Sequence, residues 1–521
     1  MLTAAALLAA MWAGDFSYRG FRVVASMIVG GGALLLLAAW FWLLSGMSRF
    51  TRGVGLGVLL SAAVLLAGLV RLDGWDGDMF PLLAWRWTPT AEERFRESAA
   101  AKETVSTGGR DNANAEAGSA GASPSLTSPS QDFPQFLGSD RTGVVRDSEL
   151  QTDWEADPPR ELWRQPIGLG WGGFAVVGSR AVTQEQRDAS EAVVCYDLAT
   201  GAELWAHTDD ARFEEALGGV GPRATPTIHA GRVYAQGAAG LLNCLELETG
   251  RRVWSTNILA DNGSSNISWG MSGSPLVAGD TVVVSPGVNG AGKPGTSLAA
   301  YDLLTGERRW AAGDGKAAYA SPQLADDGRT ILILNGPGLT AHDAADGRVL
   351  WSHPWTNGQQ INCTQPLVLQ DSGPPGGNGV RVLISSGYGQ GSALLQAADG
   401  EVSELWTTTR LKSKFSNMLF HDGYVYGLDE GILTCLDVAD GTPLWKGSRY
   451  GHGQMLLVGD VLLIQSEPGD VVLVRASPDD EIELARYPAL FDKTWNHPAL
   501  VGRMLLLRND REVVCLELPL R

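Results

Sequence analysis

The chain has 521 residues, a formal net charge of −18, 65 glycines and 18 tryptophans. This length exceeds what one hydrophobic core usually supports, so we expect several domains or one large repeat array. The acidic balance excludes nucleic acid as an expected partner, because such binding needs basic surface.

Residues 1–90 predict a membrane anchor. Residues 21–45 are an apolar run whose only charge, Arg22, lies at the edge. At a 1.5 Å rise per residue this run is long enough for a bilayer core of about 30 Å. Residues 54–70 are a second apolar run, near the lower limit of length. Residues 1–13 are apolar but too short to span, so they are either part of a helix that begins upstream or an interfacial segment.

Charge leaves the membrane topology open. Arg49 and Arg52 lie in the short connection between the two runs and favour a cytoplasmic loop. Arg19 and Arg22, at the other end of the first apolar run, favour the opposite orientation almost as strongly. Residues 91–131 then change composition to Ala, Gly and Ser with almost no large apolar side chain. Such a segment cannot offset its ordering entropy by burial, so we expect a disordered linker.

Residues 132–521 are dominated by a repeat in which a small residue precedes a Thr-Gly or Asp-Gly turn and a Trp follows ten positions after the start. The clear copies are CYDLATGAELW (195–205), CLELETGRRVW (244–254), AYDLLTGERRW (300–310), AHDAADGRVLW (341–351), QAADGEVSELW (396–406) and CLDVADGTPLW (435–445). A degraded copy starts at Val474, with Leu484 where Trp is expected. A last copy starts at Cys515.

Between the copies lie pairs of β-rich runs joined by Gly-Asp or Asp-Gly, which predict hairpins. Each repeat therefore supplies four short strands, the content of a propeller blade. The last copy lacks its fourth strand, whereas ELWRQPI around Trp163 is an unmatched fourth strand. Pairing the two would close the ring and remove both free edges. We predict an all-β, eight-bladed β-propeller behind N-terminal transmembrane helices, with seven blades as the alternative if the degraded copy does not form.

The repeated tryptophans have a structural interpretation. Each would lie on an outer strand and pack against the neighbouring blade. The set is Trp163, Trp205, Trp254, Trp310, Trp351, Trp406 and Trp445. The chain has five cysteines without a CxxC pair and seven scattered histidines, so neither a disulfide framework nor a metal site is predicted. Four of the cysteines fall at or near the small position of the repeat and are interpreted as buried small side chains.

This pattern resembles the tryptophan-docking motif of the pyrroloquinoline-quinone (PQQ) repeat family. The segment DFPQFLGSDRTGVV (132–145) also resembles the lead-in of PQQ-like propeller proteins. The family contains quinoprotein dehydrogenases and the non-catalytic propeller lipoprotein of the outer-membrane assembly machinery. Both imply a periplasmic domain, which here would be carried by the bacterial inner membrane. Catalytic members hold the quinone with a vicinal cysteine pair, stacked aromatic rings and a calcium ion, and this sequence has no adjacent cysteines.

The loops that lead into the innermost strands of a propeller meet on one face, around the central channel. By the blade assignment they present aromatic, cationic and amide side chains suited to a small polar ligand or a peptide. These candidate residues are Trp171, Arg223, Trp269, Tyr319, Asn362, Lys414, Asn417, His452, Lys493 and Trp495, with Tyr388 from a neighbouring loop. The alternative is that each simply packs the channel mouth.

Three functions compete. The favoured one is a membrane-anchored, non-catalytic binding or scaffolding propeller that acts on envelope proteins or peptides, with no cofactor. The alternative is a quinone-dependent oxidoreductase that uses PQQ with Ca²⁺ at the channel mouth. A hydrolase or lyase at the same place is the third, and no paired carboxylates there favour it. No catalytic residue is predicted.

Overall fold

The computed structural model describes residues 2–13, 18–108, 131–146, 148–290, 293–325, 328–369 and 379–521. The chain divides into two compact units. One is made of residues 1–90 with 216–219, and the other of residues 91–215 with 220–521.

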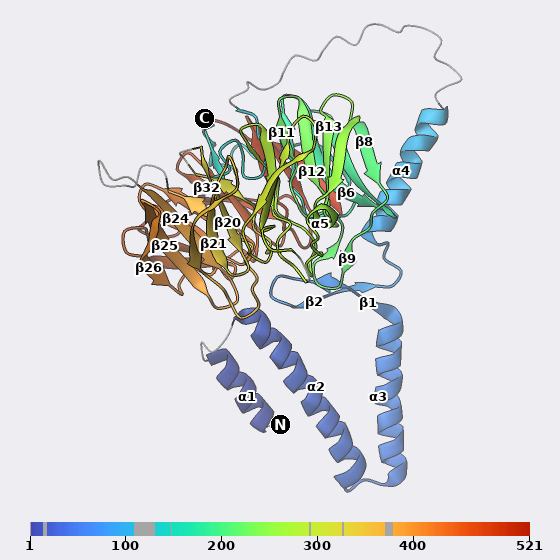
Figure 1. Cartoon of the computed structure of the whole chain (residues 1–521). Helices are drawn as coiled ribbons and strands as arrows, with labels where there is room; N and C mark the ends of the chain where they lie inside the picture. The colour runs from blue at the N-terminus through green and yellow to red at the C-terminus, as the bar shows by residue number, and fades with distance from the viewer. Residues whose placement is uncertain are drawn as a thin grey trace. The chain divides into compact units, whose positions relative to one another are not determined.

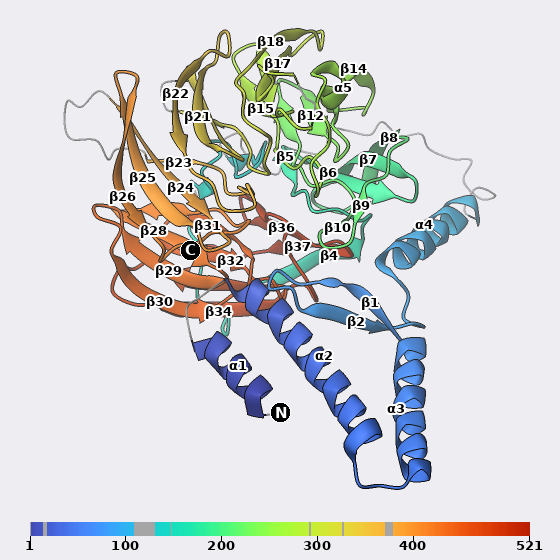
Figure 2. The same cartoon turned by 60° about the horizontal axis from the view of Figure 1, so that its bottom comes forward.

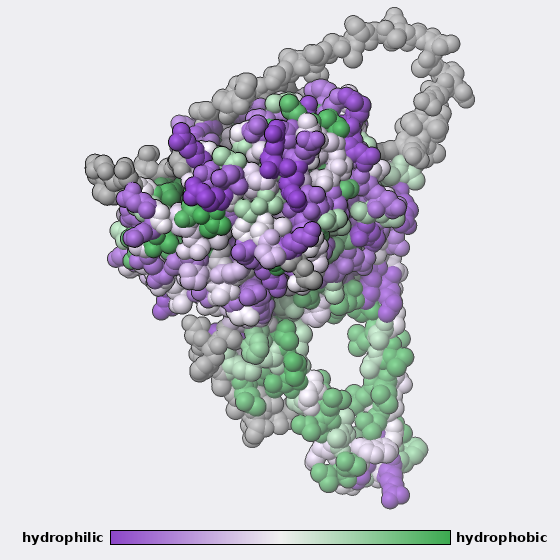
Figure 3. Space-filling model, viewed as in Figure 1, coloured by the Kyte–Doolittle hydropathy of each residue, from purple (hydrophilic) through white to green (hydrophobic). Residues whose placement is uncertain are grey.

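The N-terminal unit contains three helices and a hairpin, namely α1 (Leu2–Ala13), α2 (Arg19–Leu44), α3 (Arg49–Leu69), β1 (Val70–Trp75) and β2 (Pro81–Trp85). Helices α2 and α3 are long and apolar enough to cross a membrane. Their surfaces are strongly hydrophobic (Figure 3).

Helix α3 begins five residues before the predicted run. Its N-terminus is capped by Ser48, whose hydroxyl accepts a hydrogen bond from the Thr51 N–H at 3.1 Å. The side chain of Arg52 folds back and donates to the carbonyl of Trp42 at 2.8 Å. The hairpin β1–β2, in register from Val70 opposite Trp85, was not expected from the sequence. Trp75 and Trp85 lie in this hairpin.

The second unit is an eight-bladed β-propeller (Figures 1 and 2). Blade 1 consists of β5 (Ala175–Val177), β6 (Arg180–Arg187), β7 (Ser190–Asp197) and β8 (Glu203–Asp209), and blade 2 of β11 (Thr227–His229), β12 (Arg232–Gln236), β13 (Leu241–Glu246) and β14 (Arg252–Asn257). Blade 3 consists of β15 (Leu276–Ala278), β16 (Thr281–Val284), β17 (Leu298–Asp302) and β18 (Arg308–Ala312), and blade 4 of β19 (Gln323–Leu324), β20 (Thr330–Asn335), β21 (Gly338–Asp343) and β22 (Val349–Pro354).

Blade 5 consists of β23 (Leu367–Val368), β24 (Val380–Ser386), β25 (Gly391–Ala398) and β26 (Glu401–Thr408), and blade 6 of β27 (Leu419–His421), β28 (Tyr424–Asp429), β29 (Ile432–Asp437) and β30 (Pro443–Arg449). Blade 7 consists of β31 (Gln454–Val458), β32 (Val461–Gln465), β33 (Asp470–Arg475) and β34 (Glu483–Pro488), to which β3 (Val144–Val145) adds as a fifth strand. Blade 8 consists of β35 (Ala499–Val501), β36 (Met504–Arg508), β37 (Glu512–Glu517) and β4 (Arg160–Pro166). The remaining short elements are β9 (Glu214–Glu215), β10 (Gly219–Val220) and α5 (Ile258–Asp261).

The ring closes through the pairing predicted from the incomplete ends. Strand β4 pairs antiparallel with β37, and Trp163 lies opposite Cys515. The degraded seventh repeat also forms a complete blade, so the eight-bladed prediction is confirmed and the seven-bladed alternative is wrong.

Six of the seven repeat tryptophans donate an indole N–H to a backbone carbonyl of the next blade. The donors are Trp163, Trp205, Trp254, Trp310, Trp406 and Trp445, with acceptor distances of 2.8 to 3.2 Å. At five of these seams the indole lies against the turn glycine of the next blade. A Cβ on Gly250, for example, would lie 2.4 Å from Trp205 Cε3. The repeat turn therefore needs glycine for its left-handed φ of +69° and for the close indole.

Blades 5 and 7 depart from this scheme because their last hairpin is two residues longer. In blade 5 Trp406 pairs with Leu394, not with Gln396, where the repeat was aligned. In blade 7 the position that pairs like a repeat Trp is Ala485, opposite Leu473, so the prediction of Leu484 at that place is wrong by one residue. The longer hairpin of blade 5 leaves open space around Gly400. Trp351, which faces that blade, packs with Val380 and Val402 against the core.

The segment predicted as a disordered linker is partly helical. Helix α4 (Ala91–Gly108) has Glu92 and Glu93 in its first turn, which suits the helix dipole. It is tied to blade 1 by ion pairs, including Glu92 with Arg212 at 3.1 Å, and by the Arg187 guanidinium 5.1 Å from the Phe95 ring. Residues 109–130 lie outside the described residues.

Residues 132–145, the lead-in segment, run along the inner strands around the channel. Phe133 exchanges two backbone hydrogen bonds with Val176 of blade 1. Arg141 is buried and donates to the carbonyls of Ser274 and Pro275 on blade 3 and to Gln365 ahead of blade 5. Strand β3 then adds to blade 7, parallel to β31. The lead-in thus joins blades that are distant in sequence from one another.

Candidate functional site

The predicted site residues lie on the loops that precede the innermost strands, except Tyr388, which lies on the loop between β24 and β25. We call this set of loops the channel mouth. In the structure, most of the predicted aromatic and cationic side chains of the channel mouth form two separate clusters, each of residues in contact. The two predicted amides, Asn362 and Asn417, are instead buried between blades.

The first cluster joins blades 6, 7, 8 and 1 through rings in tilted and edge-on contact. Trp171 and Trp495 have ring centroids 4.9 Å apart, and Trp495 meets Phe415 edge-on at 5.0 Å. Phe415 in turn packs on His452 at 5.0 Å. Lys414, in the same loop as Phe415, places its ammonium 5.3 Å from the Tyr388 ring. The result is a continuous row of contacting rings with a cation beside it.

Phe415 links the row, and the sequence interpretation missed it although it chose both Lys414 and Asn417 in the same loop. The other omission is Glu467, on the loop between β32 and β33. Its carboxylate accepts hydrogen bonds from the Trp495 indole at 2.8 Å and from the His452 backbone N–H at 2.9 Å. A search of the loops between second and third strands, which end on the same face, would have found it.

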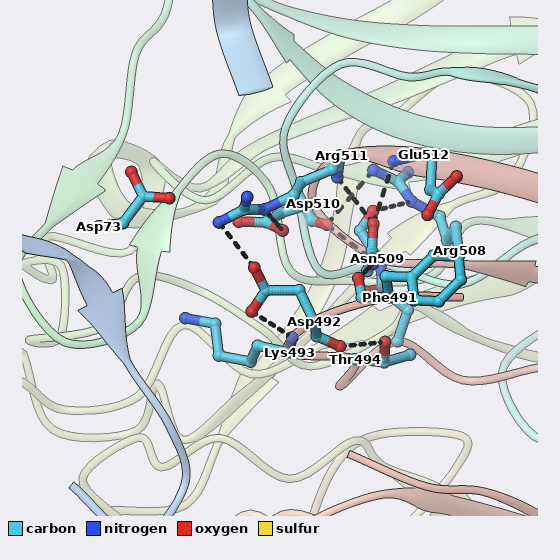
Figure 4. Close-up of polar contacts among 12 residues, drawn as sticks. Asp73, Phe491, Asp492, Lys493, Thr494, Arg508, Asn509, Asp510, Arg511 and Glu512 are labelled. Atoms are coloured by element: carbon cyan, nitrogen blue, oxygen red, sulfur yellow. Dashed lines mark hydrogen bonds and ion pairs between the residues drawn. The ribbon is translucent and has the colours of Figure 1, made fainter. Parts of the chain in front are cut away.

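Lys493 lies beside both indoles of this pair. Its ammonium lies 4.7 Å from the Trp171 ring and 4.3 Å from the Trp495 ring. The backbone around it is fixed by Asp492, which accepts from the Lys493 N–H at 2.8 Å and pairs with Arg511 at 3.1 Å (Figure 4). Burial lowers the pKa of Lys493, and the carboxylates of Asp510, Asp492 and Glu467 oppose this shift only in part. The charged ammonium is thus incompletely compensated.

The second cluster belongs to blades 2, 3 and 4. The Trp269 and Tyr319 rings lie 5.2 Å apart, and burial raises the pKa of Tyr319 to about 12. The Arg223 guanidinium lies 4.6 Å from the Phe213 ring. Burial lowers the pKa of Arg223 to about 10, against the attraction of nearby carboxylates that include Glu191. Burial likewise raises the pKa of Glu191 to about 7.

Asn362 and Asn417 are buried and act between blades. Asn362 donates to the carbonyls of Asn335 at 2.8 Å and Trp355 at 3.1 Å. Asn417 accepts from the Gln365 N–H at 2.9 Å. The same link, a side chain of one blade accepting from a backbone N–H of the preceding blade, recurs at Thr225, Ser274 and Ser321. Its signal in the sequence is a hydrogen-bonding residue directly before the Pro or Met that opens the inner strand. Thr225, Ser274 and Ser321 each precede such a proline.

The residues present do not fit PQQ with Ca²⁺. Within the part of the chain that the structure describes, no three His, Cys, Asp or Glu side chains are grouped to hold a metal ion. All five cysteines are free, and four are buried. Cys363 is partly exposed, but burial of its thiol raises the pKa to about 12, so it is not a ready thiolate.

Comparison with known proteins identifies related propellers. The family model described as outer membrane protein assembly factor BamB matches residues 146–312 and 190–447, together more than half of the chain. The chain is 28% identical to BamB of Yersinia pestis over 240 residues, which are 42% of this chain and 55% of that protein. It is 25% identical to BamB of Shewanella oneidensis over 312 residues, which are 56% of this chain and 71% of that protein. The chain thus spans just over half the length of the Yersinia relative.

Solved structures agree on the fold. The crystal structure of BamB from Moraxella catarrhalis aligns with a TM-score of 0.51 at 15% identity, covering 69% of this chain and 97% of that chain. Quinohemoprotein alcohol dehydrogenase from Comamonas testosteroni aligns with a TM-score of 0.57 at 14% identity, covering 75% and 81%. At such identities the likeness shows the propeller fold and carries no activity with it.

Proposed function

The chain belongs to the outer membrane protein assembly factor BamB family, and from that premise we propose that it is a non-catalytic binding propeller whose channel mouth takes segments of envelope proteins. The single observation that carries the proposal is the row of contacting rings from Trp171 through Trp495 to Phe415, with the Lys493 ammonium near the rings of Trp171 and Trp495. Clustered aromatic rings and cations are what peptide-binding surfaces are enriched in.

The charge state of the mouth indicates the kind of segment. Because the Lys493 ammonium is incompletely compensated, a ligand carboxylate near it would regain electrostatic energy. The rings of Trp171 and Trp495 would pack against aromatic or aliphatic side chains beside that carboxylate. We therefore propose a segment that is both aromatic and acidic.

We place the protein in the bacterial inner membrane, held by α2 and α3, with the propeller in the periplasm. Two helices long and apolar enough to span support the anchor. The relatives carry the name of an assembly factor of the outer membrane, which supports a periplasmic propeller. Arg49 and Arg52 at the turn between the helices favour a cytoplasmic turn.

The test uses the full chain in detergent and a labelled peptide of alternating phenylalanine and aspartate, followed by fluorescence anisotropy. We expect binding that weakens about tenfold or more in Phe415→Ala, because removal of an anchor ring at such a site costs about 2 kcal/mol. Trp351→Phe, a change outside the channel mouth, is the matched control. Equal binding by a phenylalanine–lysine peptide, or no loss in Phe415→Ala, would contradict the proposal.

A second arm addresses the oxidoreductase alternative. The full chain is dialysed after incubation with PQQ and Ca²⁺, and its absorbance spectrum and dye-linked alcohol oxidation are recorded. A stoichiometric bound quinone with turnover would overturn the non-catalytic proposal. Peptide binding with neither quinone nor turnover is the expected result.

A further inference from the structure

The face of the propeller opposite the channel mouth carries a groove of about 990 Å³. Its place follows from β27, which runs from the channel-mouth loop to the turn Asp422–Gly423 at the other end of the blade. The apolar part of the groove is formed by β3, β23, β27 and the C-terminal end, through Val144, Val145, Leu367, Val368, Phe420 and Leu520. Basic and acidic side chains, among them Arg146, His421, Glu149 and Asp422, are mixed around it.

The inner strands share a feature at this end of the channel. In each of blades 1, 2 and 7, the last residue of the inner strand pairs with the second strand across a two-residue turn. The residue before it turns its backbone N–H away from the blade and towards the channel, as alternate residues of an antiparallel pair do. These three N–H groups belong to Val176, Ile228 and Leu457.

The lead-in segment satisfies all three donors. Val176 donates to the carbonyl of Phe133 at 2.7 Å, Ile228 to that of Pro134 at 2.7 Å, and Leu457 to that of Gly143 at 2.8 Å. At Leu457 the contact continues as a short parallel ladder, with Val144 opposite Leu457 and Val145 opposite Val458. The molecule therefore already adds a strand to the inner edge of blade 7.

Phe420 occupies the same position on blade 6. His421 pairs with Tyr424 across the turn, as Val458 pairs with Val461 on blade 7, so Phe420 corresponds to Leu457. Its N–H therefore faces the groove, and within the described ranges no hydrogen bond to it is formed outside the blade. Its ring is half-buried and packs against the blade 5–6 core, so the strand presenting the donor is rigid.

We propose that the groove binds an extended segment of a partner protein, which adds as a strand to the inner edge of β27 as β3 adds to β31. The segment is uncharged and carries aliphatic side chains at alternate positions. The aliphatic character follows from the lining and from Val144–Val145, the pair that occupies the equivalent edge of blade 7. The mixed charges of the rim favour neither an acidic nor a basic segment. This site lies on the face away from the channel mouth and does not depend on the function proposed for it.

The experiment measures binding of a labelled heptapeptide of alternating valine and threonine to the full chain in detergent. Phe420→Pro removes the N–H donor without removing a hydrogen bond of the β27–β28 pair. We expect it to weaken binding about fivefold or more, since one backbone hydrogen bond and the adjoining ladder are lost. Val277→Pro, at the equivalent position of blade 3 and outside the groove, is the matched control. A peptide with proline at alternate positions should not bind.

Hydrogen exchange on the unmodified chain keeps the test decisive if a proline variant fails to fold. Added peptide should slow exchange of the Phe420 amide and leave that of Val277 unchanged. Two results would overturn the proposal. One is peptide binding that leaves the Phe420 amide unchanged. The other is protection of that amide by concentration-dependent self-association without peptide, which would make a second copy the occupant.

Discussion

The seams between blades can be tested by adding one methyl group at two glycines, one packed against an indole and one in open space. Gly250 and Gly400 both lie in the last hairpin turn of a blade and both have positive φ, at +69° and +83°. A Cβ on Gly250 would lie 2.4 Å from Trp205 Cε3, whereas a Cβ on Gly400 would meet no atom within 4 Å. Gly400→Ala is therefore a matched control for Gly250→Ala.

The expected costs follow from these distances. An alanine in the left-handed region costs about 1 kcal/mol in either turn. At Gly250 the methyl group must also displace a packed indole that donates to the Leu247 carbonyl at 2.8 Å. Overpacking of this kind costs about 1–3 kcal/mol more. We therefore expect the free energy of unfolding to fall by about 1 kcal/mol in Gly400→Ala and by about 2–4 kcal/mol in Gly250→Ala.

Guanidinium unfolding of the full chain in detergent, followed by tryptophan fluorescence, measures both values. In a Trp205→Ala background the indole is gone, so Gly250→Ala should cost only the conformational share, about 1 kcal/mol. Equal losses for the two glycine variants, or an undiminished loss in the Trp205→Ala background, would refute the account of the seam.

Two further predictions concern buried ionisable groups. The pKa of Glu191 is raised to about 7 by burial, so the folded state holds a proton that the unfolded state releases at about 4.5. The contribution of Glu191 to stability should therefore fall as pH rises from about 4.5 to about 7 and be constant on either side. Glu191→Gln should remove this decline, which is at most about 3 kcal/mol, in unfolding measured at pH 4 and pH 8. A decline that persists in the variant contradicts the assignment. Arg508 is buried and donates to the carbonyls of Gly168 at 2.8 Å and Gln184 at 3.0 Å. Arg508→Met should cost about 3 kcal/mol and speed amide exchange in the loop that carries Trp171. Unchanged exchange there would show that the arginine does not hold the loop.

The number of blades and the closure of the ring were predictable because each rests on a local pattern that repeats. ELWRQPI around Trp163 could be matched to the missing strand after Cys515 from the repeat alone, and the structure pairs them. The register in blades 5 and 7 was not predictable in the same way. Counting ten residues back from Trp406 assumes a hairpin of constant length, and the hairpin there is two residues longer.

The channel mouth was predictable as a face but not as a set of contacts. Loop membership identified Trp171, Lys493 and Trp495, because every propeller brings these loops together. It did not identify Phe415, whose role depends on ring distances to side chains of other blades. Asn417 was chosen for its loop and its polarity, yet tertiary packing buries it. The path of the lead-in segment likewise depends on contacts distant in sequence and leaves no periodic signal.

The pairing of β4 with β37 sets an order on the synthesis of the protein. Residues 160–166 must find residues 512–517, so the ring is completed only once the last blade has left the ribosome. Until then β4, the outer strand of blade 8, lacks its partner strand, and its unpaired backbone can form hydrogen bonds with other chains. Closure over so long a separation in sequence is also slow. A nascent propeller of this design would benefit from a factor that shields its first strand until its last one arrives.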